Sequence, residues 1–413
     1  MTQPSKLNPR LMAKNVAERA HTRRVAAWCA EIATKLNLPA REHKVLERAA
    51  RMHQQSKLFA DEAAWTGLRR ELGIEPNRAD EISEAAVETL RSLHGYRSAS
   101  QRIRNLATIL EQCDDLDGAC ELDATVSSEP DLNGLDGIIE IVAGHFGAVP
   151  KEHLDRAASR LPVFSGVVHK AIALLGNVNT NLGDLESLIS SDQTLAGHIV
   201  GAANSALMGS AIPVKSIQQA VVRIGMEAAR QIVSAAALRK LFDAKQSHAL
   251  WNHSLDVAES ASNIARRSGL VDPEEAFLAG LIHDVGRLVI ANLPAEAPAR
   301  QERLTEMGCP HTIVERVTLG QDHASIGAQV LRGWRFPEHV IAAVADHHSP
   351  ERNASPLCSV LYLAESLADE DSGLDSSWRV ELARKNLWLP ASDAQLMVGP
   401  DVAIASLRFA AAA

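Results

Sequence analysis

The stretch Leu278-Ala-Gly-Leu-Ile-His-Asp-Val-Gly-Arg287 departs from the pattern of the rest of the chain. Most of the sequence repeats apolar residues at helical spacing, with polar residues between them. Here an apolar helix end continues directly into the adjacent pair His283-Asp284, and Gly286 follows two residues later. An imidazole beside a carboxylate is costly to bury unless something pairs with both. A metal ion is one such partner, and a helix-capping aspartate beside a satisfied core histidine is the alternative.

Length and composition favour a helical protein with more than one domain. The 413 residues suffice for two or three domains, each with its own core. Ala, Leu, Arg and Glu are frequent, whereas aromatic residues make up only 4% and β-branched runs are few. These residue preferences predict an all-α protein. The net charge of −9 argues against a general nucleic-acid binder, because phosphate contacts need a basic surface, but it allows a small phosphorylated ligand in a local pocket.

The cysteines and the apolar segments indicate the compartment. The five cysteines are odd in number and lack Cys-x-x-Cys spacing, which is typical of reduced thiols rather than disulfides or a thiolate zinc site. The first ten residues contain no apolar segment of the signal-peptide kind. The best candidate for a membrane span, 276–293, is interrupted by His283, Asp284 and Arg287. We therefore expect a cytoplasmic protein without a membrane span.

Helical periodicity and composition divide the chain into four parts. Residues 119–136 are acidic, rich in small polar residues and without a sustained period, which is typical of a linker. The predicted parts are an amino-terminal helical domain at 8–120, an acidic linker with a short helix at 121–150, a main domain at 151–375 with a front subdomain (151–243) and a second bundle (248–375), and closing helices with a tail at 376–413.

Side chains that can bind metals recur in five consecutive predicted helices of the second bundle, near a helix end or on a face expected to point inward. In chain order they are His253, His283 with Asp284, His323, His347 with His348, and Glu365. Imidazole and carboxylate together suit divalent Mn, Fe, Ni or Zn, and one carboxylate can bridge two ions. Paired ions that activate water are a common means of cleaving phosphate esters. Each position alone is more often an ordinary core or surface residue, but their clustering in this order favours a site for one or two ions.

The order of these residues resembles a known superfamily. His253, His283-Asp284 and a later acidic residue resemble the HD superfamily of metal-dependent phosphohydrolases, and the additional histidines resemble its HD-GYP branch, which hydrolyses cyclic di-GMP. A closer resemblance, over about 152–370, is to the HDOD family, the HD-related output domain of bacterial signalling proteins. The residues that carry it are Leu161-Pro162, Asp192 and Leu195, Ala203-Asn204-Ser205-Ala206, Ser216-Ile217 with Ala220 and Ile224-Gly225, Gly280–Gly286, Asp322-His323-Ala324 with Gly327-Ala328, Trp334 with Pro337, and His347-His348-Ser349-Pro350.

The resemblance implies a set of ligands. One ion would be held by His253, His283, Asp284 and Glu365. A second would be held by His323, His347 and His348, with Asp284 between the two ions.

Departures from the hydrolases weigh against turnover. Glu365 stands where the family usually has Asp, and Ser349-Pro-Glu-Arg352 replaces the Gly-Tyr-Pro segment and the Glu of the cyclic di-GMP enzymes. Arg287 replaces a frequent Lys; its guanidinium can bind phosphate but is a poor proton donor to a leaving group. Asp284 and Arg287 are the candidate catalytic residues.

The amino-terminal domain is similar to a degenerate HD domain. His21 and His53 have nearly the same separation as His253 and His283, and Asp114-Asp115 ends a later helix where the terminal aspartate would stand. His94-Gly95-Tyr96-Arg97 resembles the region around Gly-Tyr-Pro. Gln54-Gln55 takes the place of the bridging carboxylate, so we expect this part to be non-catalytic. An unrelated helical sensor bundle is the alternative.

Three functions follow from the resemblance. The protein is a signalling module that acts through protein partners, a metal-dependent phosphohydrolase acting on a nucleotide such as a cyclic dinucleotide, or a receptor that binds a nucleotide second messenger without turnover. We expect no direct nucleic-acid or membrane partner, and a homodimer is compatible with the helical surfaces.

Overall fold

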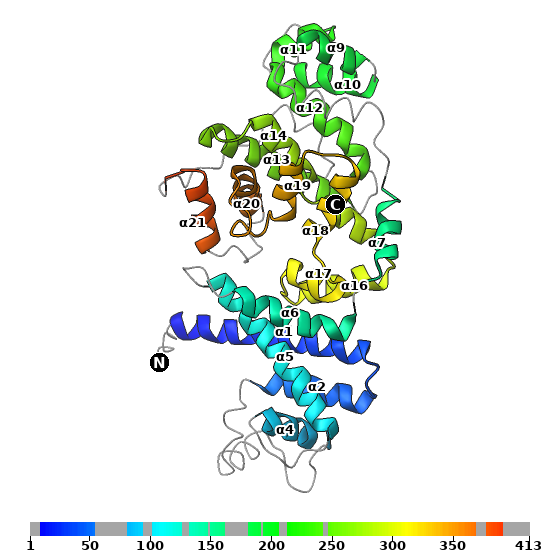
Figure 1. Ribbon diagram of the computed structural model, residues 1–413, viewed down its shortest axis with the longest axis vertical. Helices are drawn as coiled ribbons and strands as arrows, with labels where there is room; N and C mark the ends of the chain where they lie inside the picture. Colours follow the sequence, from blue (N-terminus) through cyan, green and yellow to red (C-terminus); the bar gives the residue numbers. More distant parts are fainter. Residues whose placement is uncertain are drawn as a thin grey trace, which may run out of the picture. The chain divides into compact units, whose positions relative to one another are not determined.

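The computed structural model describes residues 9–53, 81–93, 101–125, 132–147, 149–161, 181–190, 193–205, 213–242, 247–368 and 377–390. Every regular element in these ranges is a helix (Figure 1), which confirms the predicted all-α class. Contacts within the chain define two compact units. Of the described residues, the first unit comprises those up to 149 together with 294–322, and the second comprises 150–293 and those from 323 onward.

The first unit is a helical bundle around one apolar core. Its largest buried side chains include Trp28, Ile32, Leu46, Leu90 and Leu110. Its helices are α1 (Pro9–Lys35), α2 (Ala40–Met52), α4 (Glu81–Leu93), α5 (Gln101–Thr125), α6 (Leu132–Phe146), α16 (Glu296–Glu306) and α17 (His311–Leu319).

Two features of this unit differ from the segment boundaries drawn from the sequence. Helix α5 continues to Thr125 and α6 begins at Leu132, so the described residues of the acidic segment 119–136 are helical. The reason is that α6 buries an apolar stripe, from Leu135 to Phe146, in the same core. In addition, 294–322 groups with the amino-terminal helices, because α16 and α17 bury Leu304 and Val314 in that core as well.

The packing of α16 can be tested at Leu304, which is fully buried. Its replacement by alanine is expected to cost about 2–5 kcal/mol, since the removed side chain leaves a cavity. The measurement is hydrogen exchange in α1, which should become faster to the corresponding degree. The control is Leu36→Ala, because Leu36 lies in the same unit and is 42% exposed. Unchanged exchange in α1 after Leu304→Ala would show that α16 does not belong to this core.

The second unit contains the stretch Leu278–Arg287. Its helices are α7 (Lys151–Ala158), α9 (Leu182–Ser190), α10 (Gln193–Ala203), α11 (Ile217–Ile224), α12 (Met226–Arg239), the 3₁₀ helix η3 (Lys240–Phe242), α13 (His248–Ser268), α14 (Pro273–Ile282), α15 (Val285–Ala291), α18 (His323–Gly333), α19 (Glu338–Ala345), α20 (Pro356–Ala368) and α21 (Ser377–Asn386). The predicted helix after Leu161-Pro162 and the tail beyond 390 lie outside the described residues.

Short-range signals set the turn between α13 and α14, the two helices that position His253 and His283. Gly269 ends α13 with a left-handed φ of 66° and donates its N–H to the carbonyl of Ala265. Asp272 then caps α14, accepting from the N–H groups of Glu274 at 2.8 Å and Glu275 at 3.1 Å. The two helices therefore pack as an antiparallel hairpin.

Two glycines allow the helices around the site to approach closely. A Cβ atom on Gly280 of α14 would lie 2.6 Å from the Cα atom of Ala258 on α13. A Cβ atom on Gly286 of α15 would lie 1.9 Å from the carbonyl oxygen of His323 on α18. Because glycine has no Cβ atom, the helices can approach each other this closely at these two positions.

No single helix within the described ranges is both long and apolar enough to cross a membrane. The consecutive helical segments Pro273–Ala291 and Glu296–Glu306 reach that length and composition only when taken together.

Candidate metal centre

All the ligand candidates of the second bundle lie around one point in the second unit. They come from α13, the α14–α15 junction, the start of α18, the segment that follows α19 and the last turn of α20 (Figure 1). The residues are His253, His283, Asp284, His323, His347, His348 and Glu365. Three overlapping groups of these residues have ligand atoms within 4.8 Å of one another. The binding of an ion there stays a prediction.

The first group consists of His253, His283 and Glu365. The Oε2 atom of Glu365 lies 3.1 Å from the Nε2 atom of His253 and 3.1 Å from that of His283. The extra methylene of glutamate, compared with the aspartate of the family pattern, therefore does not keep the carboxylate away from the histidines. Its helix, α20, packs directly on α13.

Asp284 lies between this group and the remaining histidines, and its side chain is fully buried. Its Oδ1 atom is 3.1 Å from the Nε2 atom of His323 and 4.0 Å from that of His347. Its Oδ2 atom is 3.8 Å from the Nε2 atom of His253. Oδ1 is also 3.6 Å from the Nε2 atom of His283. The carboxylate of Asp284 thus lies within 4.0 Å of nitrogen atoms from both groups, which is the position required of a bridging ligand.

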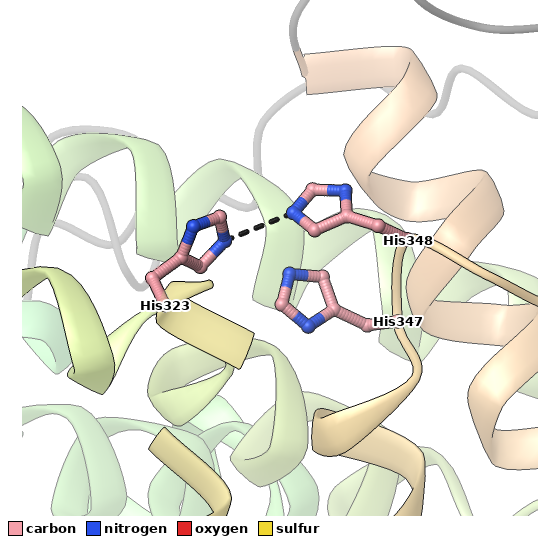
Figure 2. Close-up of side chains that lie close together, drawn as sticks. All are labelled: His323, His347 and His348. Atoms are coloured by element: carbon pink, nitrogen blue, oxygen red, sulfur yellow. Dashed lines mark hydrogen bonds between the residues drawn. The ribbon is translucent and has the colours of Figure 1, made fainter. Parts of the chain in front are cut away.

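The second group is formed by His323, His347 and His348, whose imidazoles converge in Figure 2. The Nε2 atoms of His323 and His348 are 2.9 Å apart, and the rings of His347 and His348 have centroids 4.0 Å apart. Three imidazoles at such distances present nitrogen atoms to a common volume.

Backbone contacts determine which ring nitrogen faces the centre. The Nδ1 atom of His283 is 2.7 Å from the carbonyl oxygen of Gly280, and that of His347 is 2.7 Å from the carbonyl oxygen of Val344. Because a carbonyl only accepts, each Nδ1 donates and each neutral ring turns the lone pair of Nε2 inward.

The Nε2 atoms of His283 and His347 and the carboxylate oxygens of Asp284 and Glu365 are therefore acceptors that face the centre. Among the described residues, Nε2 of His253, His283 and His347, both carboxylate oxygens of Asp284 and Oε2 of Glu365 are buried without a hydrogen-bond partner. Buried acceptors that face one another repel unless a cation lies between them. The donor set of neutral imidazoles and carboxylates fits divalent transition metals such as Mn, Fe, Ni or Zn.

The helix-capping alternative for Asp284 fails on geometry. Asp284 occupies the N-cap position of α15, but its side chain accepts no hydrogen bond from the backbone of that helix. The carboxylate is directed instead toward the histidines and toward Arg287.

The protonation states of four ligand candidates match those needed for metal binding. Burial opposes protonation of His253, but Glu365 outweighs it and raises the pKa of His253. Burial, together with the neighbouring imidazoles, lowers the pKa of His347 to about 3, and burial holds the pKa of His348 well below its usual value. Burial opposes ionisation of Asp284, but Arg287 and the nearby histidines outweigh it and hold the pKa of Asp284 well below its usual value. Burial likewise opposes ionisation of Glu365, but His283 and His253 outweigh it and hold the pKa of Glu365 low. Neutral imidazoles and charged carboxylates are the forms that bind a metal ion.

A pocket of about 440 Å³ opens beside His253 and Arg287. The Nε atom of Arg287 is 3.0 Å from Oδ2 of Asp284, and the side chain of Arg287 is 28% exposed. The guanidinium therefore joins the buried carboxylate to a space that admits a small molecule. The other lining residues are Ser247, Ala249, Leu250, Leu288 and Ala291.

These lining residues were not predicted from the sequence, although helical spacing contains a signal for some of them. Ala249 and Leu250 lie one turn before His253 on α13, and Ala291 lies one turn after Arg287 on α15. The contact between these faces of α13 and α15 depends on the tertiary structure, and no local sequence pattern predicts it.

The fold and the site together define an all-α domain with a cluster of histidines and carboxylates of the HD type. Residues 161–350 match the HDOD domain family, and this part of the chain is an HDOD domain.

Similar proteins agree with this assignment at the level of the fold. A candidate signal transduction protein from Marinobacter aquaeolei VT8 is 24% identical, with a TM-score of 0.54 over 69% of this chain and 68% of that one. An HDOD domain protein of unknown function from Geobacter sulfurreducens is 23% identical, with a TM-score of 0.50 over 58% of this chain and 89% of that one. An uncharacterized protein of Treponema pallidum (strain Nichols) is 25% identical over 179 residues, which are 42% of this chain and 34% of that protein. The match thus spans about a third of the length of this curated relative.

Proposed function

We propose that this is a bacterial signal-transduction protein whose HDOD domain binds divalent transition-metal ions and, beside them, a phosphorylated ligand such as a nucleotide second messenger. The observation that carries the proposal is the position of Asp284, whose buried carboxylate lies within 4.0 Å of nitrogen atoms from both groups of histidines. A buried carboxylate in that position is costly unless cations neutralise it, and Arg287 supplies one charge from one side only. Protein partners would then respond to the liganded state.

Each side chain has a role in this proposal. The ions would supply Lewis acidity toward phosphate oxygens. Glu365 and Asp284 would provide the negative charge that holds divalent ions, and the backbone carbonyls of Gly280 and Val344 orient His283 and His347. Arg287, at the wall of the pocket, can donate to a phosphate from its terminal nitrogens while its Nε faces Asp284.

Hydrolysis of a phosphodiester is the second candidate. The observation in its favour is that the pocket reaches His253 and lies beside the bridging carboxylate, so a bound phosphate would lie near the ions. The guanidinium of Arg287 stays protonated at all ordinary pH values, however, and donates poorly to a leaving group. Binding without rapid turnover is therefore the primary proposal.

Replacement of Arg287 by alanine tests the ligand-binding role. Loss of a charged hydrogen-bond donor costs about 1.5–3 kcal/mol, so the affinity for a bound phosphate compound is expected to fall about 10- to 150-fold. The measurement is calorimetric titration of the metal-loaded protein with cyclic di-GMP and with inorganic phosphate. The metal content should stay unchanged, because Arg287 is not a ligand.

The control for this experiment is Arg332→Ala, since Arg332 is exposed and pairs only with Glu338 among the contacts seen at its guanidinium. A purified wild-type protein with less than about half an equivalent of Mn, Fe, Ni or Zn would refute the metal proposal. Steady release of a linear dinucleotide from cyclic di-GMP, abolished in an Asp284→Ala variant, would establish the second candidate instead.

A further inference from the structure

A second cluster of imidazoles and carboxylates lies in the first unit and plays no part in the centre around Asp284. His21 comes from the middle of α1, His53 follows the end of α2, and Asp114 lies on α5. The Nε2 atoms of the two histidines are 2.9 Å apart. The Oδ1 atom of Asp114 lies 3.0 Å from Nε2 of His21 and 3.2 Å from Nε2 of His53. Three potential ligand atoms thus form a nearly equilateral triangle.

Hydrogen bonds at the other ring nitrogens orient both histidines. The Nδ1 atom of His53 is 2.5 Å from the carbonyl oxygen of Ala50, to which it donates. The Nδ1 atom of His21 is 2.7 Å from Oδ2 of Asp117, a carboxylate whose side chain is only 1% exposed. With both Nδ1 atoms donating, the Nε2 lone pairs of neutral His21 and His53 face each other and Asp114.

Asp117 is itself held in place by Arg24. The guanidinium donates from Nε to Oδ1 of Asp117 at 2.7 Å and from Nη2 to Oδ2 at 2.9 Å. This bidentate contact neutralises the buried carboxylate and leaves Oδ2 directed at His21. A carboxylate that receives the far N–H of an imidazole is the usual support of a metal-binding histidine, because it orients the ring and makes it a better ligand.

We propose that His21, His53 and Asp114 form a mononuclear site for a divalent transition metal of the Zn²⁺ or Co²⁺ kind, with Asp117 and Arg24 as positioning residues. Ligands about 2.0 Å from a tetrahedral ion are about 3.3 Å apart, so the triangle needs only small adjustments to accept one. Gln54 follows His53 in the sequence, so no carboxylate stands there to bridge a second ion.

The environment of the triangle determines how such a site would behave. His21 and His53 are buried, whereas the side chain of Asp114 is 45% exposed. An ion would therefore keep one coordination position open to water and would be removable by a chelator. Because the three ligands come from α1, α2 and α5, ion binding would stabilise the packing of those helices and make the stability of this unit respond to metal supply.

A proton on His21 competes with a metal ion for the space between the three ligand atoms. Hydrogen bonds to Asp114 and Asp117 raise the pKa of His21 to about 9 in the absence of an ion. Protonated His21 would satisfy the two carboxylates without a metal. The test must therefore detect the ion itself.

The experiment uses the full chain with His283→Ala and His347→Ala, which removes at least one member of each of the three ligand groups in the second unit, so that this centre cannot contribute. Equilibrium dialysis against Zn²⁺ at pH 7.5 is expected to load about one equivalent, and Co²⁺ should give visible absorption bands of a nitrogen- and oxygen-ligated ion. Adding Asp114→Asn, at a partly exposed position that tolerates the change, should lower Zn²⁺ affinity at least tenfold. Asp117→Asn should lower it by about 10- to 100-fold while leaving the stoichiometry unchanged.

His145→Ala serves as the matched control, because His145 is a partly buried histidine of the same unit that bonds Gln112 away from the cluster. It should leave Zn²⁺ binding unchanged. Absence of bound Zn²⁺ in the His283→Ala, His347→Ala background would overturn the proposal and assign the cluster to a protonated His21 paired with carboxylates. Binding that survives both Asp114→Asn and His53→Gln would overturn it as well. Neither outcome depends on the proposed function of the second unit, whose metal site is absent from the background.

Discussion

Replacement of Asp284 by asparagine is expected to reduce the metal content of the protein by about one to two equivalents relative to the wild type. The substitution conserves shape but removes the one negative charge that faces both groups of histidines. An amide also presents an NH₂ group toward imidazole lone pairs or toward the ions, and its oxygen is a weaker ligand than a carboxylate oxygen. Elemental analysis of protein dialysed against metal-free buffer provides the measurement.

The matched control for this substitution is Asp256→Asn on α13, since Asp256 lies one turn from His253 but is not among the ligand candidates. Its metal content should equal that of the wild type. If the Asp284→Asn protein retains the full metal content, Asp284 does not bridge, and the two groups of histidines would have to bind ions independently. Since Asp284 is fully buried beside Arg287, thermal unfolding should be recorded for the same samples.

Replacement of Gly286 by alanine is expected to destabilise the second unit by about 3 kcal/mol or more. The added methyl group would lie 1.9 Å from the carbonyl oxygen of His323 and 2.8 Å from the amide nitrogen of Gly327. Both are backbone atoms of α18, so the overlap can be relieved only if α15 and α18 separate. That separation would also move His323 away from Asp284, so the metal content should fall together with stability.

The control is Gly333→Ala at the end of α18, where an added methyl group meets no atom within 4 Å. Alanine in a helix is favoured over glycine by up to about 1 kcal/mol, so this variant should be as stable as the wild type or slightly more stable. Urea denaturation followed by circular dichroism compares the two. A Gly286→Ala protein with wild-type stability and metal content would show that the α15–α18 contact is looser than the structure describes.

The sequence alone predicted the helical class and the residues that come together at the centre. Both are local properties: helical periodicity follows from the spacing of apolar residues, and ligand-type side chains such as His283 and His347 interrupt that spacing at helix ends. The HDOD assignment also rests on short segments in a particular order, and residues 161–350 match that family.

The tertiary structure decided what depends on distant contacts. It places Glu365 within reach of His253 and His283, directs Asp284 toward histidines rather than toward the end of its own helix, and groups 294–322 with the amino-terminal helices. The positioning of His21 by Asp117 also joins residues 96 positions apart. Periodicity identifies which face of a helix is buried but not which other face it meets. That choice depends on backbone approach at positions such as Gly286 and on side-chain reach, which only the packed chain determines.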